Sequence, residues 1–313
     1  QNTNIDGIQV LPPKEGLKLP YDAIIILSFY IKDMKAQLIK LGAKENKIYH
    51  FYDLHGLIYR QAIRQPIIYY GDARKLIDSE ERTKKIVLLS ADLTLGGPAI
   101  ALFHAACILS NKGFQVLYAS MIDGPLREIV LSENIPVIID HNLQIETMKE
   151  SGWLNSFSLV ICNTINFYVL LSDRDTSIPV IWWLHDSAFF YDGVNREILR
   201  NIDGNNLLTV SVGSVPEKAF RGIRPEICVR QLIYGVKDNI RIRKAGKAFS
   251  QKVHFVTIGY IESRKGQDIL ISAIKMLPEE IRRQADFLLV GQDSSLLAQE
   301  IKKDMANITG VTI

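Results

Sequence analysis

The stretch Ile86-Val87-Leu88-Leu89-Ser90, followed by Leu95-Gly96-Gly97-Pro98, decides the fold class. A run of apolar residues without polar alternation predicts a strand buried on both faces, because a half-exposed antiparallel strand would alternate. Pro98 suits the first turn of a helix, which we expect over residues 99–112. A strand, a glycine turn and a helix in this order predict a parallel α/β unit.

The same order repeats along the chain. Further apolar runs predict strands at residues 115–119, 137–139, 159–162, 180–184 and 208–212. After a basic and polar stretch the pattern restarts, with a strand at 254–259, a helix at 268–277 and a strand at 287–291. This alternation predicts parallel, doubly wound sheets, so the expected fold class is α/β.

Changes in composition divide the chain into five parts. We expect an α/β remnant of a preceding domain at 1–71, a charged linker at 72–84 and a Rossmann-like domain at 85–236. A second linker at 237–252 leads to the start of another Rossmann-like domain at 253–313. Because that part ends in an apolar run typical of a strand start, we expect the last domain to be incomplete.

Composition excludes some partners. The 37 basic and 34 acidic residues give a net charge of +3, which is too small a field to predict a nucleic-acid groove. Cys107, Cys162 and Cys228 lie far apart in apolar runs, so we expect buried thiols in a reducing cytoplasm. The longest apolar stretch is too short to span a bilayer, and peripheral contact with the inner face of a membrane stays open.

Gly96 and Gly97 let the backbone approach a ligand closely. The amide hydrogens and the dipole of the following helix start favour a phosphate or a polarised sugar hydroxyl. The ordinary alternative is a plain turn that uses glycine for unusual backbone angles. The pattern is not the GxGxxG of dinucleotide-binding proteins, which counts against NAD.

His185 and Asp186 end the strand predicted at 180–184, and open α/β sheets bind ligands at the carboxyl ends of their strands. A neutral His185 imidazole would bind a sugar hydroxyl. Asp186 would orient His185 or cap the segment that follows. The alternative is a structural histidine with a satisfied hydrogen bond.

Gly259, Arg264 and Lys265 lie between the strand at 254–259 and the next predicted helix. Two cations at a helix start predict a pyrophosphate site that stabilises the charge on a departing nucleotide diphosphate. A solvated basic loop is the alternative. Asp173-Arg174-Asp175 matches a metal-binding DxD pattern, but that pattern belongs to a different architecture, so we expect no metal site there.

Together these features resemble the retaining glycosyltransferases of family four, which have the GT-B fold, over residues 84–313. In that family a strand ends in glycine, a lysine-glycine pair follows, and the next helix carries an alanine; Gly259, Lys265, Gly266 and Ala273 match. The resemblance implies two Rossmann-like domains that face a cleft. One departure is Tyr260, where many members have arginine.

The resemblance also implies roles for individual residues. Gly96 and Gly97 would lie near the donor phosphate and the acceptor, and His185 would contact the transferred sugar. Lys265 would bind the diphosphate, with help from Arg264. The family's late motif of two glutamates has no place before Ile313.

The function that the resemblance implies is retaining transfer of a sugar from a nucleotide-sugar donor to a glycan or glycolipid acceptor, as in bacterial surface polysaccharide synthesis. No essential metal or cofactor is expected. One alternative is a non-catalytic module that binds a nucleotide sugar or acts as a scaffold. Another is an oxidoreductase or epimerase, which should show a glycine-rich nicotinamide fingerprint.

Overall fold

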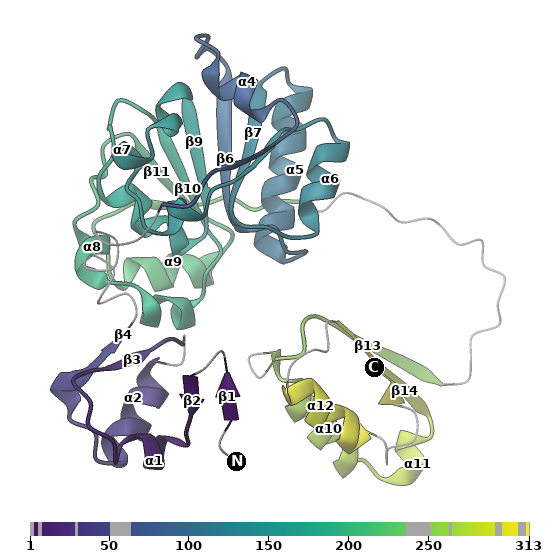
Figure 1. Cartoon of the computed structure of the whole chain (residues 1–313). Coiled ribbons are helices and arrows are strands. Elements are labelled where there is room, and N and C mark those ends of the chain that lie inside the picture. Colours follow the sequence, from purple (N-terminus) through teal and green to yellow (C-terminus); the bar gives the residue numbers. More distant parts are fainter. Residues whose placement is uncertain are drawn as a thin grey trace. The chain divides into compact units, whose positions relative to one another are not determined.

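The computed structural model describes residues 3–5, 8–28, 31–50, 64–235, 252–262, 265–291, 296–305 and 311–312. The chain divides into two compact units, Gln1–Val236 and Lys237–Ile313 (Figure 1). Each contains parallel strands and helices, so the α/β class is confirmed. The linker expected at 237–252 lies, except for Lys252, outside the described residues.

An eight-stranded sheet forms the centre of the first unit. Its strands are β5 (Ile68–Tyr70), β6 (Lys85–Asp92), β7 (Gln115–Ile122), β8 (Val137–Ile139), β9 (Leu159–Asn163), β10 (Val180–Leu184), β11 (Leu207–Ser211) and β12 (Val229–Gln231). They lie in the order β12-β11-β10-β9-β6-β7-β8-β5. All six strands predicted for this region are present.

The strand order is that of a doubly wound nucleotide-binding sheet. From β6 the chain builds outward through β7 and β8, then returns to the other side of β6 with β9, β10 and β11. The direction therefore reverses between β6 and β9. In open α/β sheets the crevice at the carboxyl ends of such strands is where ligands bind.

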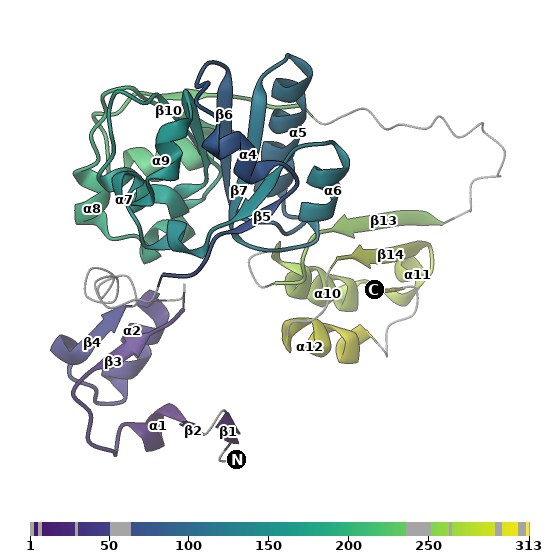
Figure 2. The same ribbon diagram turned by 45° about the horizontal axis from the view of Figure 1, so that its top comes forward.

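Helices cover both faces of this sheet. The helices α5 (Gly97–Asn111) and α6 (Leu126–Ser132) lie side by side on one face (Figures 1 and 2). α5 buries Leu102 and Ala106 against Ile86 and Leu88 of β6. The other face is covered by α4 (Ala73–Asp78), α7 (Met148–Ser151), α8 (Arg196–Arg200), α9 (Ser214–Arg221) and several short 3-10 turns.

The expected boundary near residue 71 differs from the structure. β5 pairs antiparallel with β8, and α4 buries Ala73 and Ile77 in the core of the first unit. Residues 68–70 therefore belong to this sheet and residues 73–78 to its helical cover, and not to a remnant or a linker. β5 is short and half exposed, so its sequence lacks the continuous apolar run that marks the other strands.

Residues 3–50 form small elements outside the eight-stranded sheet. β3 (Ile24–Ile26) pairs in parallel with β4 (Ile48–His50), and α2 (Ile31–Lys40) lies between them in the chain. A core of Ile26, Ala43 and Ile48 holds these elements. They are preceded by the antiparallel pair β1 (Thr3–Ile5) and β2 (Ile8–Val10) and by α1 (Pro13–Gly16).

The second unit has a three-stranded parallel sheet, with β13 (Val253–Ile258), β14 (Ala285–Val290) and β15 (Val311–Thr312) in that order. The helices α10 (Gln267–Met276) and α12 (Leu296–Met305) cover one face, and α11 (Glu279–Arg282) precedes β14. On the other face Val256, Ile258, Leu288 and Val290 are exposed. The expectation that both faces are buried is therefore wrong for the described part of this unit.

The cysteines only partly match expectation. Cys162 is buried and Cys107 is half-buried, whereas Cys228 is exposed. None of the three forms a disulfide bond within the part of the chain that the structure describes. Among the helices that the structure describes, none combines the length and apolar character that a membrane span requires.

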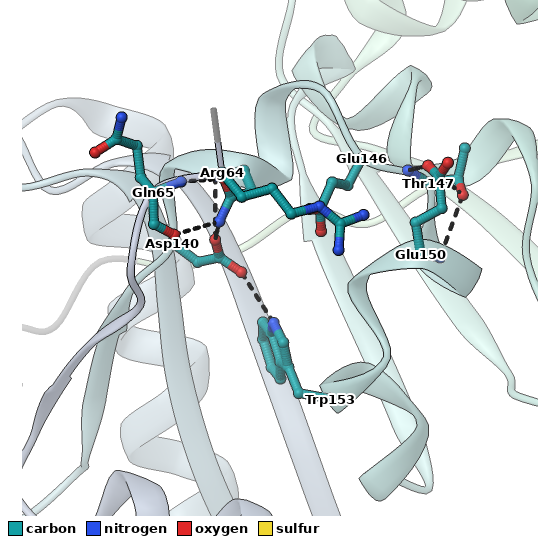
Figure 3. Close-up of polar contacts among 8 residues, drawn as sticks. Arg64, Gln65, Asp140, Glu146, Thr147, Glu150 and Trp153 are labelled. Atoms are coloured by element: carbon teal, nitrogen blue, oxygen red, sulfur yellow. Dashed lines mark hydrogen bonds and ion pairs between the residues drawn. The ribbon is translucent and has the colours of Figure 1, made fainter. Parts of the chain in front are cut away.

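A hydrogen-bonded cluster joins the segment just before β5 to the carboxyl end of β8. The Asn142 side chain accepts a bond from Gln65 N (2.9 Å) and donates to Gln65 O (2.8 Å). It also donates to Asp140 Oδ1, while Trp153 Nε1 donates to Asp140 Oδ2 (Figure 3). Arg64 forms an ion pair with the buried Glu146 in the same cluster (Figure 3). The chain before β5 is thus fixed by side-chain bonds.

We predict that Asn142→Leu lowers the free energy of unfolding by about 1–3 kcal/mol, because the Gln65 backbone loses its two bonds to the side chain and the buried Asp140 loses one hydrogen bond. Urea denaturation followed by tryptophan fluorescence measures the change. Asn155→Leu is the control, since Asn155 is exposed. Equal stability of the two variants would contradict the role of Asn142.

Candidate functional site

The glycine turn after β6 is held in place before α5 begins. The Asp92 carboxylate accepts hydrogen bonds from the backbone N and the hydroxyl of Thr94. Leu93 N donates to Ile122 O (3.1 Å), and Leu126 N donates to Leu93 O (2.9 Å). A Cβ on Gly124 would lie 2.4 Å from Leu93 O, so only glycine fits there without a shift. The turn is therefore packed against the loop that follows β7.

Gly96 and Gly97 do not serve unusual backbone angles. Gly96 has φ −77° and ψ 155°, and neither residue has a positive φ. A Cβ on Gly97 would meet no atom within 4 Å. The plain-turn alternative explained these glycines by unusual backbone angles, and the observed angles do not support that reason. What the two glycines supply is a helix start without side chains, open to a ligand.

The first turn of α5 has backbone N–H groups without a hydrogen-bond acceptor among the described residues. Its N-cap is Gly96, which has no side chain to accept a hydrogen bond from the first turn. Pro98 has no amide hydrogen, so Gly97 and Ala99 carry the free first-turn amides. Ile100 N is already bonded to Gly96 O. Together with the helix dipole, the two amides make an anion or a hydroxyl oxygen a suitable partner.

His185 directly follows β10, next to the carboxyl end of β9 in the sheet. Its ring lies 5.0 Å from that of Trp183 and 6.0 Å from that of Tyr234, measured between centroids. Burial lowers the pKa of His185 to about 4. The imidazole is therefore neutral at pH 7, and its Nε2 is buried without a partner among the described residues.

Asp186 has a different role from the one expected. Its carboxylate accepts a hydrogen bond from Ile165 N (2.6 Å), in the loop after β9. It therefore fixes the neighbouring loop and neither orients the His185 side chain nor caps the following segment. Burial raises the pKa of Asp186 to about 6, although backbone hydrogen bonds act in the opposite direction.

The second unit carries the other predicted residues. Gly259 has φ +152°, and its N donates to Val290 O (2.9 Å) at the ends of β13 and β14. A Cβ on Gly291 would overlap Gly259 O at 1.9 Å, so these strand ends need glycine at both positions. Lys265 is exposed just before α10, and Gly266 caps that helix with φ +72°. Arg264 lies outside the described residues.

The predicted residues thus fall into two groups. Gly96, Gly97 and His185 share the carboxyl edge of the eight-stranded sheet, where the strand order reverses. Gly259 and Lys265 share the strand-to-helix connection of the second unit. Each group has a helix start without a side-chain cap, at α5 and at α10.

The Asp173-Arg174-Asp175 stretch has structural partners. Asp173 forms an ion pair with Lys149 (2.5 Å), and Asp175 Oδ1 accepts a bond from Ser177 N (2.9 Å). The buried Arg174 donates to backbone carbonyls, including those of Asp203 and Asn205. These residues precede β10, at the edge opposite to His185. Within the described ranges no group of three or more His, Cys, Asp or Glu residues could hold a metal ion.

Sequence reasoning missed two residues that hold the start of α5. Asn163 Nδ2 donates to Pro98 O (2.8 Å), and the Tyr118 hydroxyl donates to Ala99 O (2.9 Å). Both side chains are fully buried. A polar residue that ends an apolar strand, as Asn163 does, was the available signal. Tyr118 lies inside a strand and gave none.

The buried Asp186 generates a pH prediction. Because its folded pKa is raised to about 6, the unfolded chain ionises first as pH rises, and stability falls between about pH 4 and pH 6. Asp186→Asn removes this titration. We expect the variant to gain up to about 3 kcal/mol of unfolding free energy relative to the parent between pH 4 and pH 7.

Chemical denaturation of both proteins at pH 4, 5, 6 and 7 measures this difference. Other titrating groups cancel in the comparison, because they are common to both chains. A stability difference that stays constant over this range would mean that Asp186 does not titrate as its burial requires.

Comparison with known proteins places this geometry in context. Residues 82–209 match the family model described as Glycosyl-transferase family 4. Comparison with curated protein sequences gives no significant match. The matched residues include Gly96, Gly97 and His185.

Two solved structures share the fold. The structure of HepE from Anabaena, in complex with UDP-glucose, has a TM-score of 0.55 at 17% identity and covers 73% of this chain and 68% of its own. WaaG, a glycosyltransferase involved in lipopolysaccharide biosynthesis, has a TM-score of 0.51 at 14% identity and covers 73% of this chain and 69% of its own. Residues 82–209 thus match a glycosyltransferase family 4 model, and the α/β fold of the chain resembles that of these two solved structures.

Proposed function

We propose that this protein transfers a sugar from a nucleotide-sugar donor to a glycan or glycolipid acceptor with retention of configuration. The observation that carries the proposal is the open start of α5. It lies at the reversal of strand order, on the same sheet edge as the neutral His185. That edge lies within the residues that match the glycosyltransferase family 4 model.

In this proposal the first-turn amides of Gly97 and Ala99 bind a phosphate of the sugar donor or a polarised hydroxyl. The positive end of the α5 dipole attracts the negative charge of that group. His185 binds a hydroxyl of the transferred sugar. Its low pKa suits this role, because a neutral ring both donates and accepts hydrogen bonds. A charged ring would only donate.

The departing nucleotide diphosphate needs positive charge. We assign that task to Lys265, which is exposed next to the start of α10 and forms no ion pair with a described carboxylate. Gly266, in the left-handed conformation, lets the chain enter α10 directly after Lys265. With a lysine and helix dipoles in place of a cation, the proposed transfer needs no metal ion.

The donor class that we propose is a uridine diphosphate sugar, because HepE binds UDP-glucose on a similar fold. Surface polysaccharide synthesis is the proposed setting, in line with the lipopolysaccharide role of WaaG. Three cysteines outside disulfides, one of them exposed, favour a reducing cytoplasm. We propose that the acceptor is presented at the inner face of the membrane.

Calorimetric titration with UDP-glucose tests the donor site. Lys265→Ala should weaken binding by roughly ten- to a hundredfold, the usual effect of one lost charge-assisted contact. Lys303→Ala is the matched control, since Lys303 is an exposed lysine on α12. The control should bind like the parent protein.

Two outcomes would contradict the proposal. Equal affinity of the Lys265→Ala and Lys303→Ala variants would remove Lys265 from the donor site. Absence of binding by the parent protein to UDP-glucose and to guanosine diphosphate sugars alike would favour a scaffolding role.

A further inference from the structure

Two buried polar side chains from the sheet bond to the first turn of α5. Tyr118, in the middle of β7, donates its hydroxyl to Ala99 O, and Asn163, the last residue of β9, donates its amide to Pro98 O. β7 and β9 lie on either side of β6. The helix start that follows β6 is therefore bonded to both neighbouring strands.

These hydrogen bonds are not needed to form the helix. The carbonyls of Pro98 and Ala99 lie inside α5 and already have the ordinary partners four residues further on. Burying a hydroxyl and an amide is unfavourable unless they are paired, and apolar residues would fill the same space without that cost. What the two bonds add is a fixed position of the α5 first turn on the sheet.

The turn before α5 is fixed as well. Leu93 is bonded at its N to Ile122 O and at its O to Leu126 N, and Gly124 lets this carbonyl approach. The Gly96–Gly97 turn is thus held on both sides, by Leu93 before it and by Pro98 and Ala99 after it. Its amides have little freedom to move.

Asn163 also belongs to the surroundings of His185. In the sheet it is the register partner of Trp183, and Thr164 N donates to Trp183 O (2.8 Å). The Trp183 ring lies 5.0 Å from that of His185. Asn163 therefore contacts the start of α5 through its side chain and lies beside the end of β10 through its backbone.

The Asn163 side chain has one unsatisfied hydrogen-bond acceptor. Its Oδ1 is buried and has no hydrogen-bond partner among the described residues. Such unpaired buried atoms are uncommon in folded proteins and destabilise them. Stability alone therefore does not account for an amide at this position.

We propose that Tyr118 and Asn163 are positioning residues that orient the Gly97 and Ala99 amides toward the nucleotide-sugar substrate. The inference rests on the proposed function, and it assigns no contact with the ligand to either side chain, because both are fully buried. Hydrogen-bond donors that are fixed before the reaction stabilise developing charge best, since the protein does not have to reorganise during the reaction. Small shifts of such donors weaken this effect.

The test uses Tyr118→Phe, which removes one hydroxyl and leaves Ala99 O its helical partner. At saturating UDP-glucose, the rate of UDP release should fall about tenfold, while the dissociation constant should rise about threefold or less. In a ¹H–¹⁵N spectrum, the shift of the Gly97 amide on addition of UDP-glucose should shrink. Asn163→Leu, which keeps the size and removes the donor, should act in the same direction.

Tyr191→Phe is the matched control. The Tyr191 hydroxyl is also buried, and it has no hydrogen-bond partner among the described residues. This variant should keep the parental rate and the parental Gly97 shift. Melting temperatures of all variants separate a loss of stability from a loss of positioning, because only the latter changes the Gly97 response below the transition.

The two proposals fail in different ways. If the parent binds and turns over UDP-glucose while Tyr118→Phe retains its rate and its Gly97 shift, the positioning role is wrong even if the melting temperature falls. If the parent itself neither binds nor cleaves UDP-glucose or guanosine diphosphate sugars, the proposed function fails and the positioning role fails with it. If Asn163→Leu does not fold, Tyr118→Phe alone still tests the positioning role.

Discussion

A parallel sheet covered by helices on both faces leaves only its edges open to a ligand, and this constraint determines where chemistry can occur in the first unit. Each strand then offers one or two residues beyond its carboxyl end. Between β6 and β9 the connections leave in opposite directions, so the edge is least obstructed there. The start of α5 lies beside this point without side chains on Gly96 and Gly97. The candidate site depends on that combination.

Electrostatics divides the tasks within this edge. Burial keeps His185 neutral at pH 7, and Asp186, whose pKa burial raises to about 6, is still mostly ionised there, so this pair supplies no positive charge. Such an environment suits recognition of hydroxyl groups more than of phosphates. Positive potential comes instead from the uncapped α5 start. In the second unit it comes from Lys265 beside the uncapped start of α10.

Much of the fold could be predicted because the buried strands are continuous apolar runs, which is a local property of the sequence. β5 was missed, since a short antiparallel edge strand with an exposed Ile68 lacks that property. Gly96, Gly97 and His185 were predicted as site residues from their places after strand ends, and the structure puts them at one edge of the sheet. Tyr118, Asn163 and Gly124 were not, because their partners lie 19, 65 and 31 residues away in the chain. Only the folded sheet brings these pairs together, and Asp186 was misjudged for the same reason.

Hydrogen–deuterium exchange of the whole chain with and without UDP-glucose tests the central claim most directly. The account predicts slower exchange of the amides in residues 93–100 and 183–187, which surround the start of α5 and the end of β10, and in residues 259–268. Unchanged exchange at both 93–100 and 183–187, or protection confined to the opposite sheet edge around Lys149 and Arg174, would contradict it.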